Sequence, residues 1–214
     1  SDIEEIRTKV APFFANRFSR ENIAPKSCTN YSFYTIGELT EKFAEVYRED
    51  ARYAGLKKMT DALEAKIRAR LPPLDKRPRV ALVYCGNRRF TPYNIRPDGF
   101  AMAQYRVLGV RDAFADFKHI QAYTGTGGGG VGQSLDLEDL LAVDPDVIIM
   151  PFAGAVTPGN GAEVGFQSLL ALKDDPVACH LKAFKNNRVY AGGTPLQGPV
   201  FYIFQLELAA RQIY

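Results

Sequence analysis

The sequence is poor in the residues that most often hold metal ions. Its 214 residues include only three cysteines and two histidines. No two cysteines have the C-x-x-C spacing of a zinc ligand pair, which argues against a metal site. So few cysteines fit a reducing compartment, but they also fit a large extracytoplasmic domain that needs no disulfides. The cysteine content therefore leaves the location of the protein open.

Long hydrophobic runs and a strong charge imbalance are also absent. No apolar run reaches the roughly 18 residues that suggest a membrane span. The first residues show no signal peptide and are typical of a helix inside a domain. The formal net charge is only +3, from 27 basic and 24 acidic residues that are spread along the chain. This balance predicts no nucleic-acid partner.

The first clear pattern along the chain is helical. Apolar residues at helical spacing predict a long helical segment over residues 36–71, either as two consecutive helices or as one bent helix. A capping box of Thr35 and Glu38 begins it, and Pro72 and Pro73 end it because proline cannot continue the hydrogen-bond ladder.

Beyond Pro78, short apolar strands alternate with helices. Strands are predicted at residues 79–84, 119–123, 147–150 and 188–191. Helices are predicted at residues 99–108, 135–142 (capped by Ser134), 166–172, 176–184 and 199–213. This alternation predicts an α/β fold with a three-layer, Rossmann-like, mainly parallel sheet flanked by helices and preceded by the long helix.

A glycine cluster at residues 125–134 partly matches two nucleotide-binding motifs. Gly125, Gly127 and Gly130 have G-x-G-x-x-G spacing, but four residues separate the last of them from the next helix. Gln133 replaces the lysine of a P-loop. The alternatives are a flexible surface loop and a mobile loop at the rim of a ligand cleft.

Catalytic motifs are missing. There is no G-x-S-x-G nucleophile turn, and His119 and His180 lie in no recognisable motif. The sequence therefore predicts no catalytic residues, no metal ligands and no resident cofactor.

Ligands of open α/β sheets bind beyond the carboxyl ends of the strands. The loops predicted there contain arginine, aromatic and amide side chains, which suit a planar or anionic small ligand. The candidate ligand-binding residues are Arg88, Arg89, Tyr93, Phe152 and Gln197, with Arg96 nearby. The alternative for Arg88 and Arg89 is a solvated loop pair.

One stretch of the sequence resembles a known family. Residues 134–149, SLDLEDLLAVDPDVII, resemble the helix and following strand of helical-backbone (class III) substrate-binding proteins, which serve ABC importers for ferric siderophores, haem and cobalamin. Residues 184–190 resemble a later strand of that family, and residues 199–214 resemble its closing helix. Residues 10–35 resemble the stretch that leads into its backbone helix.

The resemblance implies two α/β lobes joined by one helix, with the ligand in the cleft between them. Residues 1–35 would be the tail of an incomplete N-terminal lobe, residues 36–71 the inter-lobe helix and residues 78–214 the C-terminal lobe, so the chain would be a C-terminal-lobe fragment. It would not be an enzyme. It would bind a metal chelate outside the cytoplasm and deliver it to ABC permease subunits, meeting the membrane only through the permease or a lipid anchor. Arg88 and Arg89 would neutralise the ligand, and Glu163 is the candidate acid for permease docking.

Two alternatives stay open beside this reading. The first is an enzyme or metallocluster scaffold of the same helical-backbone design, which would use Cys85 just beyond a strand. The second is a nucleotide-binding domain that uses the glycine loop at residues 125–132.

Overall fold

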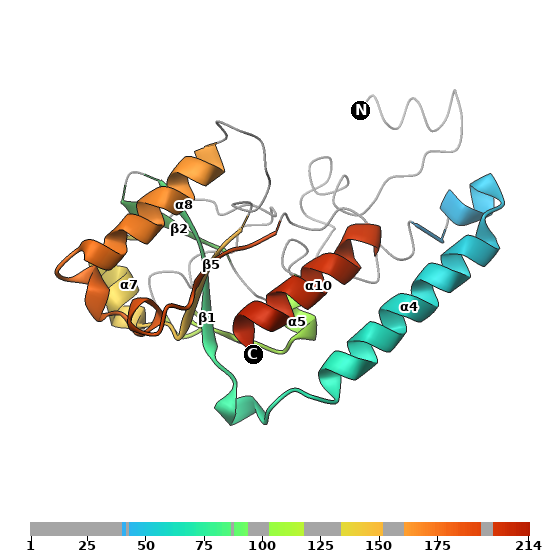
Figure 1. Ribbon diagram of the computed structural model, residues 1–214, viewed down its shortest axis with the longest axis horizontal. Helices are drawn as coiled ribbons and strands as arrows, with labels where there is room; N and C mark the ends of the chain where they lie inside the picture. The colour runs from blue at the N-terminus through green and yellow to red at the C-terminus, as the bar shows by residue number, and fades with distance from the viewer. Residues whose placement is uncertain are drawn as a thin grey trace.

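The chain forms an open sheet with helices packed on both faces, as Figure 1 shows in this computed structural model. The structure describes residues 40–41, 43–86, 88–93, 103–117, 134–151, 161–193 and 199–214. The helices on one side of the sheet are α4 (Asp50–Arg68), α5 (Ala103–Val107) and α10 (Pro199–Ile213). On the other side lie α7 (Leu137–Val143), α8 (Gly161–Ala171) and α9 (Lys182–Lys185). The predicted three-layer α/β fold class is confirmed.

The sheet has the strand order β2-β1-β4-β5, and β3 pairs with the start of β1. Its strands are β1 (Arg79–Gly86), β2 (Arg89–Tyr93), β3 (Arg111–Asp112), β4 (Val147–Met150) and β5 (Val189–Ala191). The pairs that β1 makes with β3 and β4, and that β4 makes with β5, are parallel. All four residues of β4 are buried, as expected for a strand covered on both faces.

Two apolar clusters hold helices to the two faces of the sheet. Val80, Leu82 and Ile149 project toward α5, α4 and α10, where Leu206 and Ile213 are buried with them. The alternate residues Ala81, Val83, Ile148 and Met150 project toward α7, α8 and α9. Successive strand residues point to opposite faces, so one short apolar run supplies both clusters.

The predicted helical segment is broken at Arg48. Residues 43–47 are helical, and Arg48 has a φ of 59°. The amide of Glu49 donates to Ala44 O at 2.8 Å, and the amide of Arg48 donates to Glu45 O at 3.3 Å. This is the Schellman pattern that ends a helix. Two consecutive helices, one of the two predicted alternatives, are therefore confirmed. The Thr35 capping box lies outside the described residues.

The prediction of a loop directly after strand 79–84 was wrong. β2 folds back antiparallel on β1, with Leu82 opposite Tyr93 and Gly86 opposite Arg89. Pro92 conceals this strand in the sequence, because proline is excluded from central strands. It is tolerated here since β2 is an edge strand, on which an amide hydrogen is not required.

The prediction that Ser134 caps the next helix was also wrong. Leu135 exchanges two backbone hydrogen bonds with Phe90, which holds residue 135 in an extended bridge. The helix therefore starts later, with Asp136 as its N-cap and Asp139 completing a capping box.

The predicted helix over residues 176–184 is divided in two. The 3-10 turns η2 (Leu172–Asp174) and η3 (Ala178–His180) follow α8, and α9 begins only at Lys182. Leu181 is extended and fully buried, and the amide of Lys182 donates to the Asp144 carboxylate at 3.0 Å. The burial of Leu181 and the hydrogen bond from the Lys182 amide stabilise this break more than a continued helix would.

The remaining elements are close to prediction. The final helix begins and ends where residues 199–213 predicted it, and α8 starts five residues earlier than expected. The two-residue strand β3 was not predicted, and the candidate strand at residues 119–123 lies outside the described part of the chain. Among the described residues, no helix is both long and apolar enough to span a membrane.

Candidate functional site

The carboxyl ends of β1, β4 and β5 meet at one edge of the sheet because these strands are parallel. Such an edge is where open α/β sheets bind ligands. The described chain at this edge comprises the β1–β2 hairpin, Pro151 after β4, and Gly192 and Gly193 after β5.

The two glycines after β5 allow a close backbone approach. The Gly192 amide donates to Met150 O at 2.8 Å. A Cβ at Gly192 would lie 2.7 Å from Ile149 Cγ2 and 3.2 Å from the Tyr105 hydroxyl. A Cβ at Gly193 would lie 2.8 Å from the side-chain amide of Gln205. This end of β5 is therefore packed directly against polar groups from α5 and α10.

Those polar groups are functional candidates that the sequence patterns did not reveal. Tyr105 is 1% exposed, and its burial raises the pKa of its phenol well above the usual range, so the hydroxyl is neutral. Gln104 precedes Tyr105 in α5. Gln104 is also 1% exposed, and its Oε1 has no partner among the described residues. The signal that the sequence offered was the position of Gln104 within an apolar helical stretch.

Arg88, the first of the predicted ligand residues, is engaged within the protein. It lies in the hairpin turn with a φ of 59°, and its Nη2 is 2.5 Å from Asp175 Oδ2. Asp175 also accepts hydrogen bonds from the amides of Val177 at 2.9 Å and Ala178 at 3.0 Å. The contact therefore joins the hairpin to the segment between η2 and η3.

Arg89 and Tyr93 are brought to one face of β2, since they are four residues apart in a strand of period two. Arg89 is exposed, whereas Tyr93 is half-buried and packs against the cluster shared with α5 and α10. The two Cα atoms are separated by about 13 Å of strand, at roughly 3.3 Å per residue. They define a stripe rather than one contact point.

Several predicted positions lie outside the described residues. These are Phe152, Gln197, Arg96, His119 and the glycine loop at residues 125–133. Their roles, and the nucleotide-binding alternative that rests on the glycine loop, stay predictions.

The cysteine expected for a metallocluster is poorly suited to the task. Cys85 is fully buried, and desolvation raises the pKa of its thiol. In the described ranges, no group of three or more histidine, cysteine, aspartate or glutamate side chains could hold a metal ion. His180 is exposed on η3, and Glu163 is exposed in the first turn of α8.

The two aspartates of the Asp144-Pro145-Asp146 sequence form contacts within the protein rather than at a ligand site. Asp144 has a φ of 43° at the end of α7, and its carboxylate contacts the amide and the Nζ of Lys182, each at 3.0 Å. Asp146 Oδ2 accepts a 2.8 Å hydrogen bond from the Arg79 amide, which aligns the starts of β1 and β4. These acids lie at the amino-terminal edge of the sheet, opposite the predicted ligand loops.

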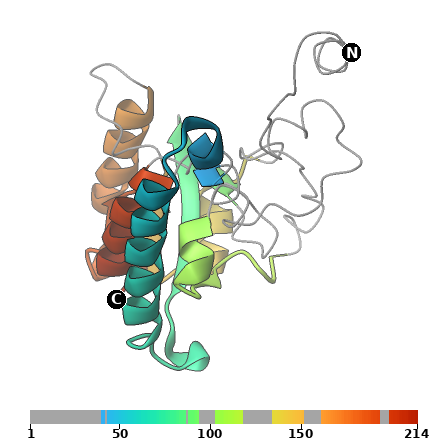
Figure 2. The ribbon, with the colours of Figure 1, turned by 90° about the vertical axis from the view of Figure 1, so that its right-hand side faces the viewer.

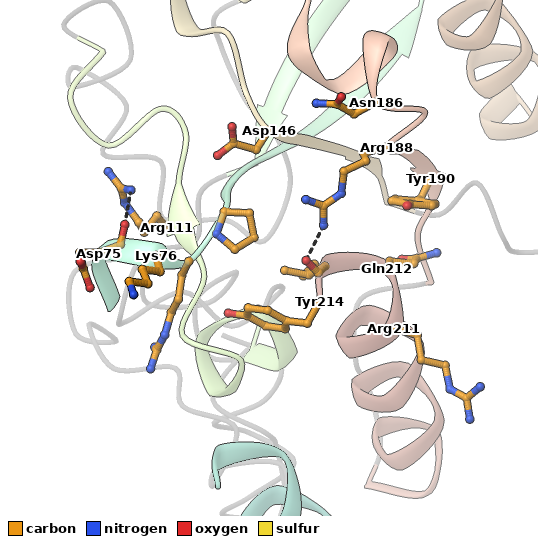
Figure 3. A pocket seen from close by; sticks show the side chains of 13 residues that line it. Asp75, Lys76, Arg111, Asp146, Asn186, Arg188, Tyr190, Arg211, Gln212 and Tyr214 are labelled. Carbon is orange, nitrogen blue, oxygen red and sulfur yellow. Dashed lines mark hydrogen bonds between the residues drawn. The ribbon is translucent and has the colours of Figure 1, made fainter. Parts of the chain in front are cut away.

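A cavity of about 660 Å³ lies at this same amino-terminal edge (Figure 3). It is lined by residues that precede β1, β4 and β5 and by the end of α10. It contains none of the predicted ligand residues, so it is a different feature from the carboxyl edge.

No protein-family profile matches this chain, and no curated protein matches it in sequence. Solved structures do match it in fold. A periplasmic binding protein from Veillonella parvula aligns with a TM-score of 0.63 and 17% identity over 98% of this chain and 64% of its own. The periplasmic heme-binding protein RhuT from Roseiflexus sp. RS-1 aligns with a TM-score of 0.60 and 18% identity over 86% of this chain and 63% of its own.

An ABC-type Fe3+-hydroxamate transport system protein from Saccharomonospora viridis aligns with a TM-score of 0.54 and 19% identity. That alignment covers 86% of this chain and 56% of the other. The chain thus spans less than two thirds of the length of each of these three structures. The resemblance to substrate-binding proteins is confirmed at the level of the fold.

Proposed function

We propose that this chain belongs to the substrate-binding component of an ABC importer that captures a ferric siderophore or a related iron or tetrapyrrole ligand. The observation that carries the proposal is the fold. A three-layer sheet with a leading helix is shared, over 86% to 98% of the chain, with periplasmic and ABC-type binding proteins. Two of those proteins are named for heme and for Fe3+-hydroxamate, which are the chelate classes proposed here.

In this proposal the described sheet is one wall of a cleft, and α4 is part of the helix that leads to the other lobe. Residues 1–35, 36–71 and 78–214 retain their proposed assignments as N-terminal lobe tail, inter-lobe helix and C-terminal lobe. The protein acts outside the cytoplasm, performs no catalysis and passes its ligand to permease subunits, with Glu163 as the proposed docking acid of this lobe.

The carboxyl edge supplies two kinds of ligand contact. The exposed guanidinium of Arg89 can form forked, charge-assisted hydrogen bonds to a carboxylate or catecholate group. The Tyr105 hydroxyl provides a neutral hydrogen-bonding group beside Gly192. Arg88 contributes less, because Asp175 already neutralises it.

The direct test is ligand titration of the full-length protein. Haemin, a ferric hydroxamate siderophore, a ferric catecholate siderophore and cobalamin would each be titrated, with intrinsic tyrosine fluorescence and calorimetry as readouts. We expect saturable binding for one class at one site per molecule. Binding of none of the four would reject the ligand assignment.

The two hairpin arginines provide a matched pair of variants. We expect Arg89→Gln to weaken ligand binding about tenfold or more, which corresponds to the loss of a hydrogen bond to a charged group. Arg88→Gln should change the affinity less than threefold. Calorimetric titration of both variants checks this, and a larger loss in Arg88→Gln would contradict the assignment of Arg89 as the ligand-facing arginine.

A further inference from the structure

The cavity at the amino-terminal edge of the sheet is rich in basic side chains. Its lining includes Lys76, Arg77, Arg111, Arg188 and Arg211, but only two acidic side chains, Asp75 and Asp146. Because Arg211 is paired with Glu207, which does not line the cavity, the remaining four basic side chains exceed the two acidic ones by two charges.

Most of this positive charge has no carboxylate partner among the residues that the structure describes. Arg211 is paired with Glu207 at 2.7 Å, and Figure 3 shows it directed away from the other lining residues. The remaining four cations are absent from the ion pairs found among the described residues. Unpaired cations in a concave surface focus a positive potential, which favours an anion from solution.

Backbone carbonyls hold three of these guanidinium groups in position. Arg188 Nη2 donates to Ile213 O, and Arg77 donates to Pro72 O at 2.8 Å and to Gly109 O at 3.0 Å. Arg111 Nη1 donates to Asp75 O at 3.4 Å. These contacts fix the side chains but leave the charges unneutralised, and each arginine has five N–H donors, more than these contacts use.

The cations stand on two sides of the cavity. Figure 3 shows Lys76 and Arg111 on one side, and Arg188 with the Tyr190 ring on the other. An anion with two charged groups therefore matches the arrangement better than a single small ion. Arginine forks match the oxygen geometry of phosphate, and the half-buried position of Arg188 strengthens such a contact.

We propose that this cavity is a second binding site, separate from the carboxyl edge, which takes an anion with two phosphate groups. Arg188 and Arg111 donate to the phosphate oxygens from opposite sides, and Lys76 adds charge. The phosphates can come from a soluble phosphorylated molecule or from lipid headgroups, and the recognition chemistry is the same in both cases.

The test uses the full-length protein without its cleft ligand, at low ionic strength. Pyrophosphate is titrated by calorimetry and by thermal shift, with sodium chloride at equal ionic strength as the reference. In parallel, the protein is sedimented with phosphatidylglycerol vesicles and with neutral phosphatidylcholine vesicles. Lys76→Gln and Arg111→Gln are the main variants, because both side chains are exposed, so we expect the variants to fold.

Arg52→Gln is the control, since it removes one positive charge from an 83% exposed side chain on α4, as each single variant does at the cavity. We expect the double variant Lys76→Gln/Arg111→Gln to weaken binding at least tenfold and Arg52→Gln to change it less than twofold. Binding of pyrophosphate supports a soluble source, and binding of phosphatidylglycerol vesicles alone supports a lipid source. No binding to either probe, or equal losses in the double variant and the Arg52 control, would overturn the proposal.

Discussion

At the scale of single residues, the half-buried carboxylate of Asp175 makes several contacts. The amides of Ala178 and Val177 donate to it, and Arg88 pairs with it. These three groups stabilise the ionised form and lower the pKa of the Asp175 carboxyl below its ordinary value, to about 2. Asp175 thereby links the β1–β2 hairpin to the start of η3.

A depressed pKa makes this contribution dependent on pH. Because the folded pKa lies below the unfolded one, the stabilisation is present above about pH 4 and is lost as the pH falls toward about 2. We expect Asp175→Asn to be less stable than the native protein at pH 7, with a gap that narrows between pH 4 and pH 2. Urea unfolding midpoints of both proteins at pH 7, 5, 4 and 3 would measure this difference in stability.

The neighbouring Asp174 provides the control. It is exposed and accepts none of the side-chain hydrogen bonds identified in the described residues. Asp174→Asn should therefore unfold at nearly the native midpoint at every pH. A gap for Asp175→Asn that stays constant from pH 7 to pH 3 would show that its carboxylate charge is irrelevant to stability.

At the scale of elements, α8 packs closely on β1. Figure 2, turned by 90° from Figure 1, shows α4 and α10 side by side. A Cβ at Gly165 would be only 2.2 Å from the Cys85 carbonyl oxygen and 2.8 Å from Met150 Cε. The backbone oxygen cannot move without disturbing the strand. We expect Gly165→Ala to lower the free energy of unfolding by about 1–3 kcal/mol, as overpacked substitutions do.

Gly55 is the matched control within a helix. It lies in α4, and a Cβ there would meet no atom within 4 Å. Gly55→Ala should raise the free energy of unfolding by about 0.5–1 kcal/mol, because alanine loses less backbone entropy in a helix. Chemical unfolding of both variants tests the pair, and stabilisation by both substitutions would mean that α8 is not tightly packed on β1.

Elements with a strong local pattern were predictable from the sequence, and those fixed by distant contacts were not. The apolar run at Val147 predicted β4, and the amphipathic pattern from Pro199 predicted α10. β2 was missed because the tolerance for Pro92 depends on its being an edge strand. The same holds for the candidate site. Arg88 pairs with Asp175, which lies 87 positions away in the sequence, so no local sequence pattern predicts the pair.

At the scale of the whole molecule, Arg79 connects elements from three separate parts of the chain. Its Nη1 donates to Val143 O at the end of α7 at 2.8 Å, and its Nη2 donates to Ala113 O after β3 at 3.0 Å. Its amide donates to the Asp146 carboxylate, and its carbonyl accepts from the Asp146 amide at 2.9 Å. One residue therefore fixes how α7, β3 and β4 meet the start of β1.

Replacing Arg79 with methionine keeps the aliphatic stem and removes the donors. Two carbonyls then lose charged hydrogen bonds, so we expect Arg79→Met to lower the free energy of unfolding by about 2–4 kcal/mol. Arg211→Met, which breaks only an exposed pair within α10, should cost less than about 0.5 kcal/mol. The chain has no tryptophan, so tyrosine fluorescence and circular dichroism would follow unfolding. Both signals should shift together in Arg79→Met, because the residue joins elements on which the entire sheet depends. A shift in only one signal would mean that Arg79 stabilises a local segment.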